Sequence, residues 1–151
     1  MVLWTTPAGS VVHQRYFKSE FTQVKTIALG MTKYHRPRVA RDGDEFDLSK
    51  VEASTAANFV HSLDASILQL ALNEFEPACS VTHDCFYARA GNELEEMLNR
   101  IKSSFVDVIS SDCLSNFAVE NGVPEAASEV LTKKNLDFDY EEVLQSKFLF
   151  C

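Results

Sequence analysis

The stretch 80-SVTHDCFYA-88 places a histidine and an aspartate side by side between two short apolar runs. Residues 78–82 and 85–89 have the composition of two short strands, so His83 and Asp84 fall at the bend of a hairpin. An aspartate at a tight bend can project its carboxylate above the sheet edge, where strand pairing fixes its direction. Magnesium-dependent phosphoryl transfer needs that arrangement. A lone His-Asp pair is also common by chance, and a turn aspartate that caps its own backbone is the simpler interpretation.

A helix is predicted on either side of this hairpin. From Ala56 to about Phe75, apolar residues recur at intervals of three and four and define one helix face: Val60, Leu63, Ile67, Leu70 and Ala71. His61, Asp64 and Leu68 share a neighbouring face. Pro77 ends the helix.

The second helix is predicted at about 92–109, with Asn92 and Glu95 as its capping pair. Its apolar stripe consists of Leu94, Met97, Leu98, Ile101, Phe105 and Val108. Shorter helices are expected at 112–121, 124–131 and 139–146, the last with Asp139 as its N-cap.

The N-terminal third predicts extended structure instead. Residues 10–17 and 22–39 are rich in Val, Ile, Thr, Tyr and Phe without a helical period, which favours strands or a long β-ribbon. Pro37 and the polar run 41–47 are expected to end the ribbon in a loop. The order of ribbon, helix, hairpin and helix predicts an α+β fold, a β-hairpin flanked by helices with an N-terminal β-ribbon.

Composition indicates one globular domain, because 46% of the 151 residues are apolar and 24% are charged. We expect no signal peptide and no transmembrane segment, since no apolar run is long enough. The cysteines (Cys79, Cys85, Cys113 and Cys151) form no CxxC pair, which favours a reduced, intracellular chain.

The net charge of −8 argues against a free-standing nucleic-acid binder, yet the charge is unevenly distributed. Between His13 and Arg41, only Glu20 opposes a series of bases, namely Arg15, Lys18, Lys25, Lys33, Arg36, Arg38 and Arg41. Acids dominate from Glu93 onward. This asymmetry indicates a basic arm that meets an anion, although a merely solvated basic surface would look the same.

Four segments together resemble the C-terminal part of the single-subunit DNA-directed RNA polymerases of the phage and mitochondrial type. Helix segment 57-ANFVHSLDAS-66 is similar to that family's PNFxHSxD motif, and 82-THDCFYA-88 to its HDS/HDC-aromatic hairpin. The opening 4-WTTPAGSVVHQRY-16 resembles W-x-TP-x-G-x-x-V-x-Q-x-Y, and 144-LQSKFLFC-151 resembles the closing L-x-S-x-F-x-F. The matches run in order along nearly the whole chain. Ala57 stands where the family usually has Pro, and Ile67 where many phage members have His.

The resemblance implies catalytic roles for the hairpin and its helix. Asp84 matches the second of two palm aspartates that hold Mg²⁺, and His83 matches the neighbour that supports the hairpin and the primer end. His61 matches a histidine near the minor groove and the sugar of the incoming nucleotide. Asp64 is expected to orient its neighbours. The tail residues Phe150 and Cys151 match an end that approaches the active site.

The resemblance also gives the basic arm a partner. Residues 16–47 correspond to the specificity loop, a ribbon that enters the promoter major groove, where a two-stranded ribbon fits. Four positions are expected to reach base edges: Gln23, Lys25, Lys33 and His35. Phosphate contacts are expected from Arg36, Arg38 and Arg41, and also from Lys50. Residues 56–109 would be the palm helix-hairpin-helix, and residues 110–151 the C-terminal helices and tail of a right-hand polymerase palm and fingers region.

One carboxylate cannot hold two metal ions, so we expect that this chain alone does not polymerise RNA. The other palm aspartate and the fingers helix would come from a separate N-terminal polypeptide, and DNA template, nascent RNA and NTPs would be the further partners. The alternative is a non-catalytic remnant that binds DNA through its ribbon. The expected location is the cytoplasm, that of the host for a phage-encoded chain, or the mitochondrion for an organellar one.

A third reading takes Cys79, His83 and Cys85 as zinc ligands. Their C-x3-H-x-C spacing is not a familiar zinc pattern, and a fourth ligand is missing. Family A DNA polymerases also have a His-Asp hairpin, but they typically place Glu where this chain has Cys85 and lack the NFxHSxD helix.

Overall fold

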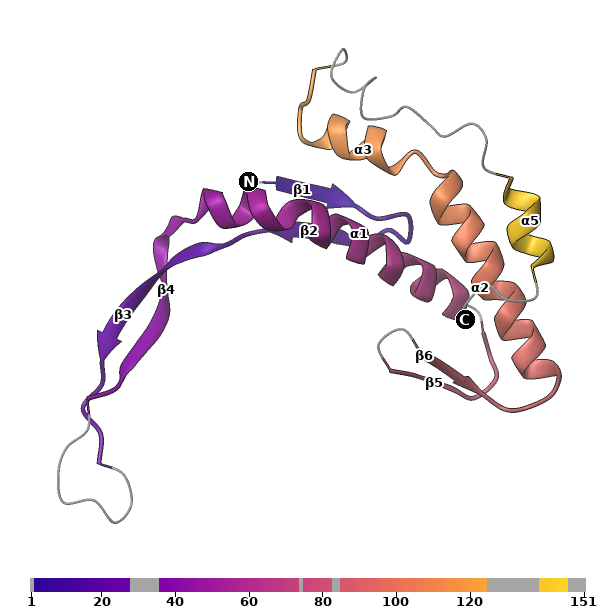
Figure 1. Cartoon of the computed structure of the whole chain (residues 1–151), viewed down its shortest axis with the longest axis horizontal. Helices are drawn as coiled ribbons and strands as arrows, with labels where there is room; N and C mark the ends of the chain where they lie inside the picture. The colour runs from indigo at the N-terminus through magenta and orange to yellow at the C-terminus, as the bar shows by residue number, and fades with distance from the viewer. Residues whose placement is uncertain (1, 28–35, 74, 83–84, 125–138, 147–151) are drawn as a thin grey trace. The chain divides into compact units, whose positions relative to one another are not determined.

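The computed structural model describes residues 2–27, 36–73, 75–82, 85–124 and 139–146. Its elements are helices and two-stranded sheets (Figure 1), in agreement with the predicted α+β class. The chain forms two compact units. One comprises Met1–Val2 and Gln14–Ala56, and the other Leu3–His13 and Ala57–Cys151.

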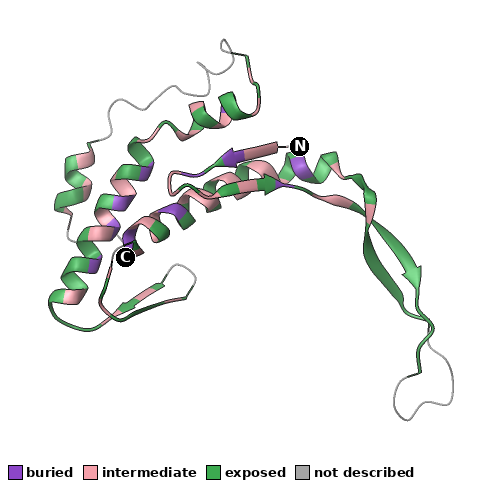
Figure 2. Cartoon of the chain, turned by 180° about the vertical axis from the view of Figure 1, so that it is seen from behind, coloured by how far each residue is buried: buried purple, intermediate pink, exposed green. Residues whose placement is uncertain are grey.

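The first unit contains the ribbon. Strand β3 (Phe17–Gln23) pairs antiparallel with β4 (Arg38–Phe46), and Figure 2 shows both strands almost wholly exposed. The predicted loop at 41–47 is therefore wrong, because the ladder continues to Phe46. The rings of Phe17 and Phe46 stack at 4.8 Å and hold the two strands together at this end. A polar sequence is compatible with a strand here because solvent reaches most of its side chains.

A bulge interrupts the ribbon close to this stacked pair. Phe17 pairs with Phe46 and Ser19 with Asp42, so β4 advances four residues while β3 advances two. Gly43 lies in the bulged part of β4. A Cβ added there would come within 2.9 Å of the Lys18 carbonyl oxygen, so close approach of the two backbones requires glycine.

Strands β1 (Val2–Thr5) and β2 (Val11–Gln14) form a second pair, joined by a tight turn. The Ser10 N–H donates to Thr6 Oγ1 at 3.1 Å, the Thr6 N–H donates to the Ser10 carbonyl, and Gly9 takes a φ of 83°. A positive φ of this size favours glycine. The turn chemistry of residues 6–10 thus closes the hairpin.

Helix α1 (Leu48–Leu72) begins well before the predicted start at Ala56. Asp47 explains the earlier start, because its carboxylate accepts a hydrogen bond from the Lys50 N–H at 3.0 Å and its carbonyl accepts from Val51 N–H. The residues before Ala56 lack an apolar stripe, so their helix was not visible from hydrophobic spacing.

Trp4 packs against α1 and is 1% exposed. Its ring lies 5.7 Å from the ring of Phe59 and 5.8 Å from that of Phe117, and its indole N–H donates to Ser62 Oγ at 2.8 Å. The small Ser66 is fully buried, whereas Val60 is 55% exposed. The predicted apolar face was therefore wrong at Val60, because β1 packs against the side of α1 that carries the serines.

The predicted hairpin is confirmed as β5 (Cys79–Thr82) and β6 (Cys85–Ala88). It precedes α2 (Asn92–Ser110), whose buried side includes Met97, Ile101 and Val108. The predicted capping pair of Asn92 and Glu95 is wrong. Asn92 is already helical, and Gly91 occupies the N-cap without a side-chain bond.

Helix α3 (Cys113–Glu120) follows, and α5 (Tyr140–Gln145) closes the described chain. The predicted N-cap of α5 is confirmed, because Asp139 accepts a hydrogen bond from Glu141 N–H at 2.9 Å. Lys102 of α2 donates to the carbonyls of Leu144 and Ser146 at the carboxyl end of α5. The predicted helix at 124–131 lies outside the described residues, apart from Pro124.

Candidate functional site

The β5–β6 ladder fixes the two sides of the candidate catalytic bend. Thr82 pairs directly with Cys85 and Val81 with Phe86, so the ladder is complete up to the residues that flank His83 and Asp84. Those two residues lie outside the described part of the chain. Side chains alternate between the faces of a strand, so Thr82 and Cys85 share one face, with Ser80 and Tyr87.

The opposite face of the hairpin packs onto the protein core. Phe86 contacts the buried cluster of Ala71, Met97 and Ile101, which joins the carboxyl end of α1 to α2. Tyr87, on the other face, is 57% exposed. Within the part of the chain that the structure describes, the hairpin therefore packs through the Phe86 face, while Thr82, Cys85 and Tyr87 on the other face are exposed.

Arg100 links α2 to the segment that follows α1. Its Nη1 donates to the Asn73 carbonyl at 2.9 Å, just past the end of α1, and its guanidinium lies 5.9 Å from the Phe75 ring. A cation at the carboxyl end of a helix also interacts favourably with the helix dipole. This contact ties α2 to the end of α1, the helix that precedes the hairpin in the chain.

The predicted site residues of α1 are both solvent-exposed. His61 and Asp64 are three residues apart on the helix, and the intervening Ser62 accepts the Trp4 hydrogen bond. Trp4 packs against the side of α1 that carries Ser62. This packing leaves the adjacent His61 exposed to solvent. The tail residues Phe150 and Cys151 lie outside the described chain, as do Lys33 and His35 of the ribbon.

The remaining ribbon residues expected to meet nucleic acid are all exposed: Gln23, Lys25, Arg36, Arg38 and Arg41. Gln23 pairs directly with Arg38, whereas Arg41 pairs with Glu20. The Arg38 guanidinium lies 5.0 Å from the ring centroid of Phe21. Arg38 and Arg41, both expected to contact phosphates, thus lie in different environments.

Two lysines near the base of the ribbon have partners in the chain. Lys18 forms an ion pair with Glu45 at 2.8 Å, and the hydrogen bond and charge of Glu45 raise the pKa of this lysine. Lys50, expected to be a phosphate contact, is exposed, with its ammonium 4.7 Å from the Tyr16 ring centroid.

The register of the hairpin argues against the zinc reading. Cys79 belongs to the face with Val81 and Phe86, whereas Cys85 belongs to the face with Thr82, so the two thiols point to opposite sides. Among the described residues, no group of three or more His, Cys, Asp or Glu side chains could hold a metal ion.

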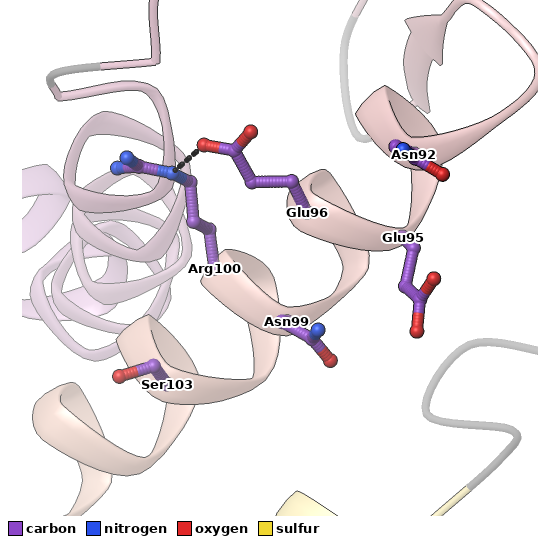
Figure 3. Close-up of a pocket in the computed structure, with 6 residues that line it drawn as sticks. All are labelled: Asn92, Glu95, Glu96, Asn99, Arg100 and Ser103. Atoms are coloured by element: carbon purple, nitrogen blue, oxygen red, sulfur yellow. Dashed lines mark hydrogen bonds and ion pairs between the residues drawn. The ribbon is translucent and has the colours of Figure 1, made fainter.

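A surface hollow lies along α2. Its described lining, shown in Figure 3, comes entirely from one helix: Asn92, Glu95, Glu96, Asn99, Arg100 and Ser103. Its charged groups include the ion pair of Arg100 and Glu96 at 3.0 Å, which stabilises consecutive turns of the helix.

A comparison with protein families matches nearly the whole chain to one family. Residues 1–148 match the family described as DNA-dependent RNA polymerase. The chain belongs to this family. The matched range includes the β5–β6 hairpin and α1.

Plant organellar polymerases are among the similar family members. DNA-directed RNA polymerase 3, chloroplastic, of Nicotiana sylvestris is 30% identical over 99% of this chain, and DNA-directed RNA polymerase 1, mitochondrial, of Arabidopsis thaliana is 29% identical over 99%. The chain spans about 15% of the length of these relatives. DNA-directed RNA polymerase 1A of Nicotiana tabacum is 28% identical, and 94% of its length is matched. No helix among the described residues has the length and apolar character needed to cross a membrane.

The opening motif of the chain, residues 4–16, has a structural explanation that sequence reasoning missed. Trp4 fills the space beside α1, Thr6 and Gly9 close the turn, and the buried Gln14 donates to Ser54 Oγ at 2.8 Å. These residues position the helix that carries His61. The sequence signal for these contacts was the W-x-TP-x-G motif, because apolar periodicity does not reveal them.

Proposed function

We propose that this chain is the C-terminal catalytic segment of a DNA-directed RNA polymerase that transfers ribonucleotides to a growing RNA on a DNA template. The family match over residues 1–148 carries the proposal. The β5–β6 ladder supports it, because its pairing continues to the positions on either side of His83 and Asp84. In this proposal the segment forms part of the palm and fingers region.

Asp84 is the residue proposed to hold Mg²⁺. Carboxylate oxygen is the ligand that this cation prefers, and the flanking Thr82 and Cys85 are exposed, so a hydrated ion can approach this end of the hairpin. When bound between carboxylates, paired Mg²⁺ ions stabilise the attacking and leaving oxygens of a phosphoryl transfer. The donor chemistry of the site therefore fits the metal.

The other residues of the segment position the reactants. His61 is proposed to lie near the sugar of the incoming nucleotide, Asp64 to orient its neighbours, and His83 to support the primer end. The Phe86 contact with the core supports a fixed direction for the hairpin that carries Asp84. Phe150 and Cys151 are proposed to reach the same site from the tail.

The experiment that tests this proposal replaces Asp84 with Asn in the polymerase that contains the segment. Ribonucleotide incorporation on a promoter template with Mg²⁺ should fall by roughly 100-fold or more, since several kcal/mol of transition-state stabilisation are lost. Asp107→Asn is the matched control, because it removes an exposed carboxylate from α2 and should leave incorporation unchanged. Equal activity of Asp84→Asn and the parent would refute the catalytic role.

The rest of the polymerase is the proposed partner of this segment. It would supply the second palm aspartate and the fingers helix, whether from a separate N-terminal polypeptide or otherwise. The chloroplastic and mitochondrial names of the relatives support an organellar site of action over the cytoplasmic one first expected.

A second candidate function is DNA binding without catalysis, favoured by the exposed basic residues of the ribbon. In that case the chain would bind DNA with an affinity that falls as salt rises, and Asp84→Asn would have no effect on either binding or transcription. Simultaneous replacement of Arg36, Arg38 and Arg41 by Ala should weaken binding. Unchanged affinity of that triple variant would exclude the ribbon as the DNA contact.

A further inference from the structure

The register of the ribbon assigns its side chains to two different faces. Alternation places Phe21, Gln23 and Arg38 on one face, which we call the Arg38 face, together with Ser19, Ala40 and Asp42. Glu20, Thr22, Val39 and Arg41 lie on the opposite face, which we call the Arg41 face. The two arginines, three residues apart in the sequence, therefore point away from each other.

The two faces differ in charge. On the Arg41 face, Arg41 lies directly across from Glu20, and opposite charges in such a pair attract each other. On the Arg38 face, Arg38 lies across from the neutral Gln23, and the next pair toward the base, Phe21 with Ala40, is uncharged. Among the paired residues that the structure describes on that face, Asp42 is the one acid, and it lies one pair further toward the base. The outer end of the Arg38 face therefore carries a positive charge that no cross-strand acid offsets.

The Arg38 guanidinium is also positioned by an aromatic ring. Its Cζ lies 5.0 Å from the centroid of Phe21, a ring that is itself 60% exposed. A guanidinium that interacts with a ring through its π face keeps its in-plane N–H donors available, and less side-chain freedom is lost when it binds. The neighbouring Gln23 adds an amide that can donate and accept.

We propose that the Arg38 face, and not the Arg41 face, is the side of the ribbon that enters the groove of double-stranded DNA, with Arg38 and Gln23 as its contacts. This inference rests on the proposed polymerase function and adds which side of the ribbon meets DNA. An arginine fork fits paired acceptors such as guanine O6 and N7, and Gln can pair with adenine.

Duplex DNA is the occupant that the ribbon fits best. The major groove of B-form DNA is wide enough for a two-stranded β-ribbon, whereas the deep, narrow major groove of A-form RNA excludes side chains. The outer part of the ribbon is basic although the whole chain carries a net charge of −8. DNA is therefore attracted to this part of the chain and not to its acidic remainder.

The experiment compares two single variants in the full chain. Binding of a fluorescent mixed-sequence DNA duplex, and of an RNA duplex of the same sequence, is measured by anisotropy at low ionic strength. Arg38→Ala should weaken DNA binding by about ten-fold, the size expected for loss of one bidentate contact. Arg41→Ala removes the same charge from the other face and should change the affinity by less than about three-fold, as expected for a rim contact.

A second pair of variants separates positioning from charge. Phe21→Leu keeps the charge and the apolar surface but removes the aromatic ring beneath Arg38, so it should weaken DNA binding by about three-fold, as expected from loss of a cation–π contact. Val39→Ala, an exposed apolar residue on the Arg41 face, should have no effect. The backbone of each variant is checked by circular dichroism.

The outcomes distinguish this inference from the proposed function. Should Arg41→Ala weaken DNA binding as much as Arg38→Ala, or more, the assignment of the face is wrong while DNA contact by the ribbon stands. If neither arginine matters, or if the parent chain binds no DNA, the ribbon is not a DNA contact and the inference fails, while the Asp84→Asn measurement still decides the catalytic proposal. Preference for the RNA duplex would also overturn the inference.

Discussion

At the scale of single residues, Trp4 positions the part of α1 that carries His61, one of the proposed site residues. Trp4 combines burial, two aromatic neighbours and a hydrogen bond to Ser62, the residue next to His61. A buried indole usually has a partner for its N–H, and here that partner lies on the helix that the ring packs against. The orientation of His61 therefore depends on a residue far away in the sequence.

Replacement of Trp4 by Ala should lower the free energy of unfolding by about 3–5 kcal/mol, because it removes a fully buried aromatic side chain and leaves a cavity. Urea denaturation followed by circular dichroism measures the change. Val60→Ala on the same helix is the control, since Val60 is 55% exposed and its replacement should cost less than about 1 kcal/mol. Similar losses from both variants would contradict the packing described for Trp4.

At the scale of elements, the β5–β6 hairpin is a short two-stranded unit, and an isolated unit of this kind is marginally stable in water. Its attachment to the core through Phe86 is therefore what keeps it in place. The exposed face with Ser80 and Tyr87 contributes little burial. Among the described residues, Phe86 thus connects the hairpin to the core formed by α1 and α2.

Replacement of Phe86 by Ala should increase the amide exchange rate of β5 and β6, because the hairpin opens more easily without its core contact. Global stability should fall by about 1–3 kcal/mol, less than for a fully buried ring. Tyr87→Ala is the matched control, as it removes an aromatic side chain from the adjacent position on the exposed face. Hydrogen exchange with peptide-level mass spectrometry compares the two. Equal protection of the hairpin in both variants would show that Phe86 does not anchor it.

Gly43 is a corresponding weak point of the ribbon. Gly43→Val should separate the strands near the bulge, because the new Cβ would lie 2.9 Å from the Lys18 carbonyl oxygen. Faster amide exchange in Phe17–Gln23 and Arg38–Phe46 is the expected result, with a loss of about 1–3 kcal/mol in local stability. Ala40→Val, which adds a similar side chain within the regular ladder, should leave exchange unchanged. Normal protection in the Gly43 variant would mean that the bulge tolerates a side chain.

At the scale of the whole molecule, the chain consists of two compact units with different sources of stability. The ribbon unit relies on its strand ladder and the Phe17–Phe46 stack, whereas the second unit has the buried cluster of Ala71, Met97 and Ile101. Local stability can differ between such units, and the unit with less apolar burial opens more readily. A substitution that disrupts the core of one unit should therefore destabilise that unit more than the other.

Ile101→Ala tests this difference. It should destabilise the second unit by about 2–5 kcal/mol while amide exchange by local opening in β3 and β4 stays unchanged, because the described ladder of the ribbon contains no residue of α2. Leu98→Ala on the same helix is the control with a half-exposed side chain. Hydrogen exchange reports both units in one measurement. A uniform loss of protection would indicate a single cooperative unit.

The sequence allowed prediction of those elements whose signals are local. The hairpin strands followed from composition, and the start of α5 from Asp139, because a side-chain cap needs only neighbouring residues. The early start of α1 at Leu48 and the burial of Ser66 were missed, since both depend on contacts that apolar spacing does not encode. For the candidate site, motif order indicated the family, while Asp84 and His83 remain predictions.

The separation of the ribbon arginines could not be deduced from spacing alone. Arg38 and Arg41 looked equivalent because both follow Pro37 in a basic run. Their opposite directions depend on the strand continuing through residues 41–46, which a polar composition did not suggest. Strand register, once known, separates them by simple alternation.

Two hydrogen bonds join Leu3 of β1 to Asn121 at the end of α3, and this clamp has a consequence for folding kinetics. The Leu3 N–H donates to the Asn121 side-chain oxygen at 3.1 Å and the Leu3 carbonyl accepts from its amide at 2.7 Å, across a separation of 118 residues. Contacts between distant residues form slowly, because the entropy of closing the loop is lost before the contact is gained. Because β1 precedes α3 in the chain, it has to wait for α3 during synthesis on the ribosome before this clamp can close. Strand β1 is therefore tied to Asn121 only after α1, α2 and α3 have been made.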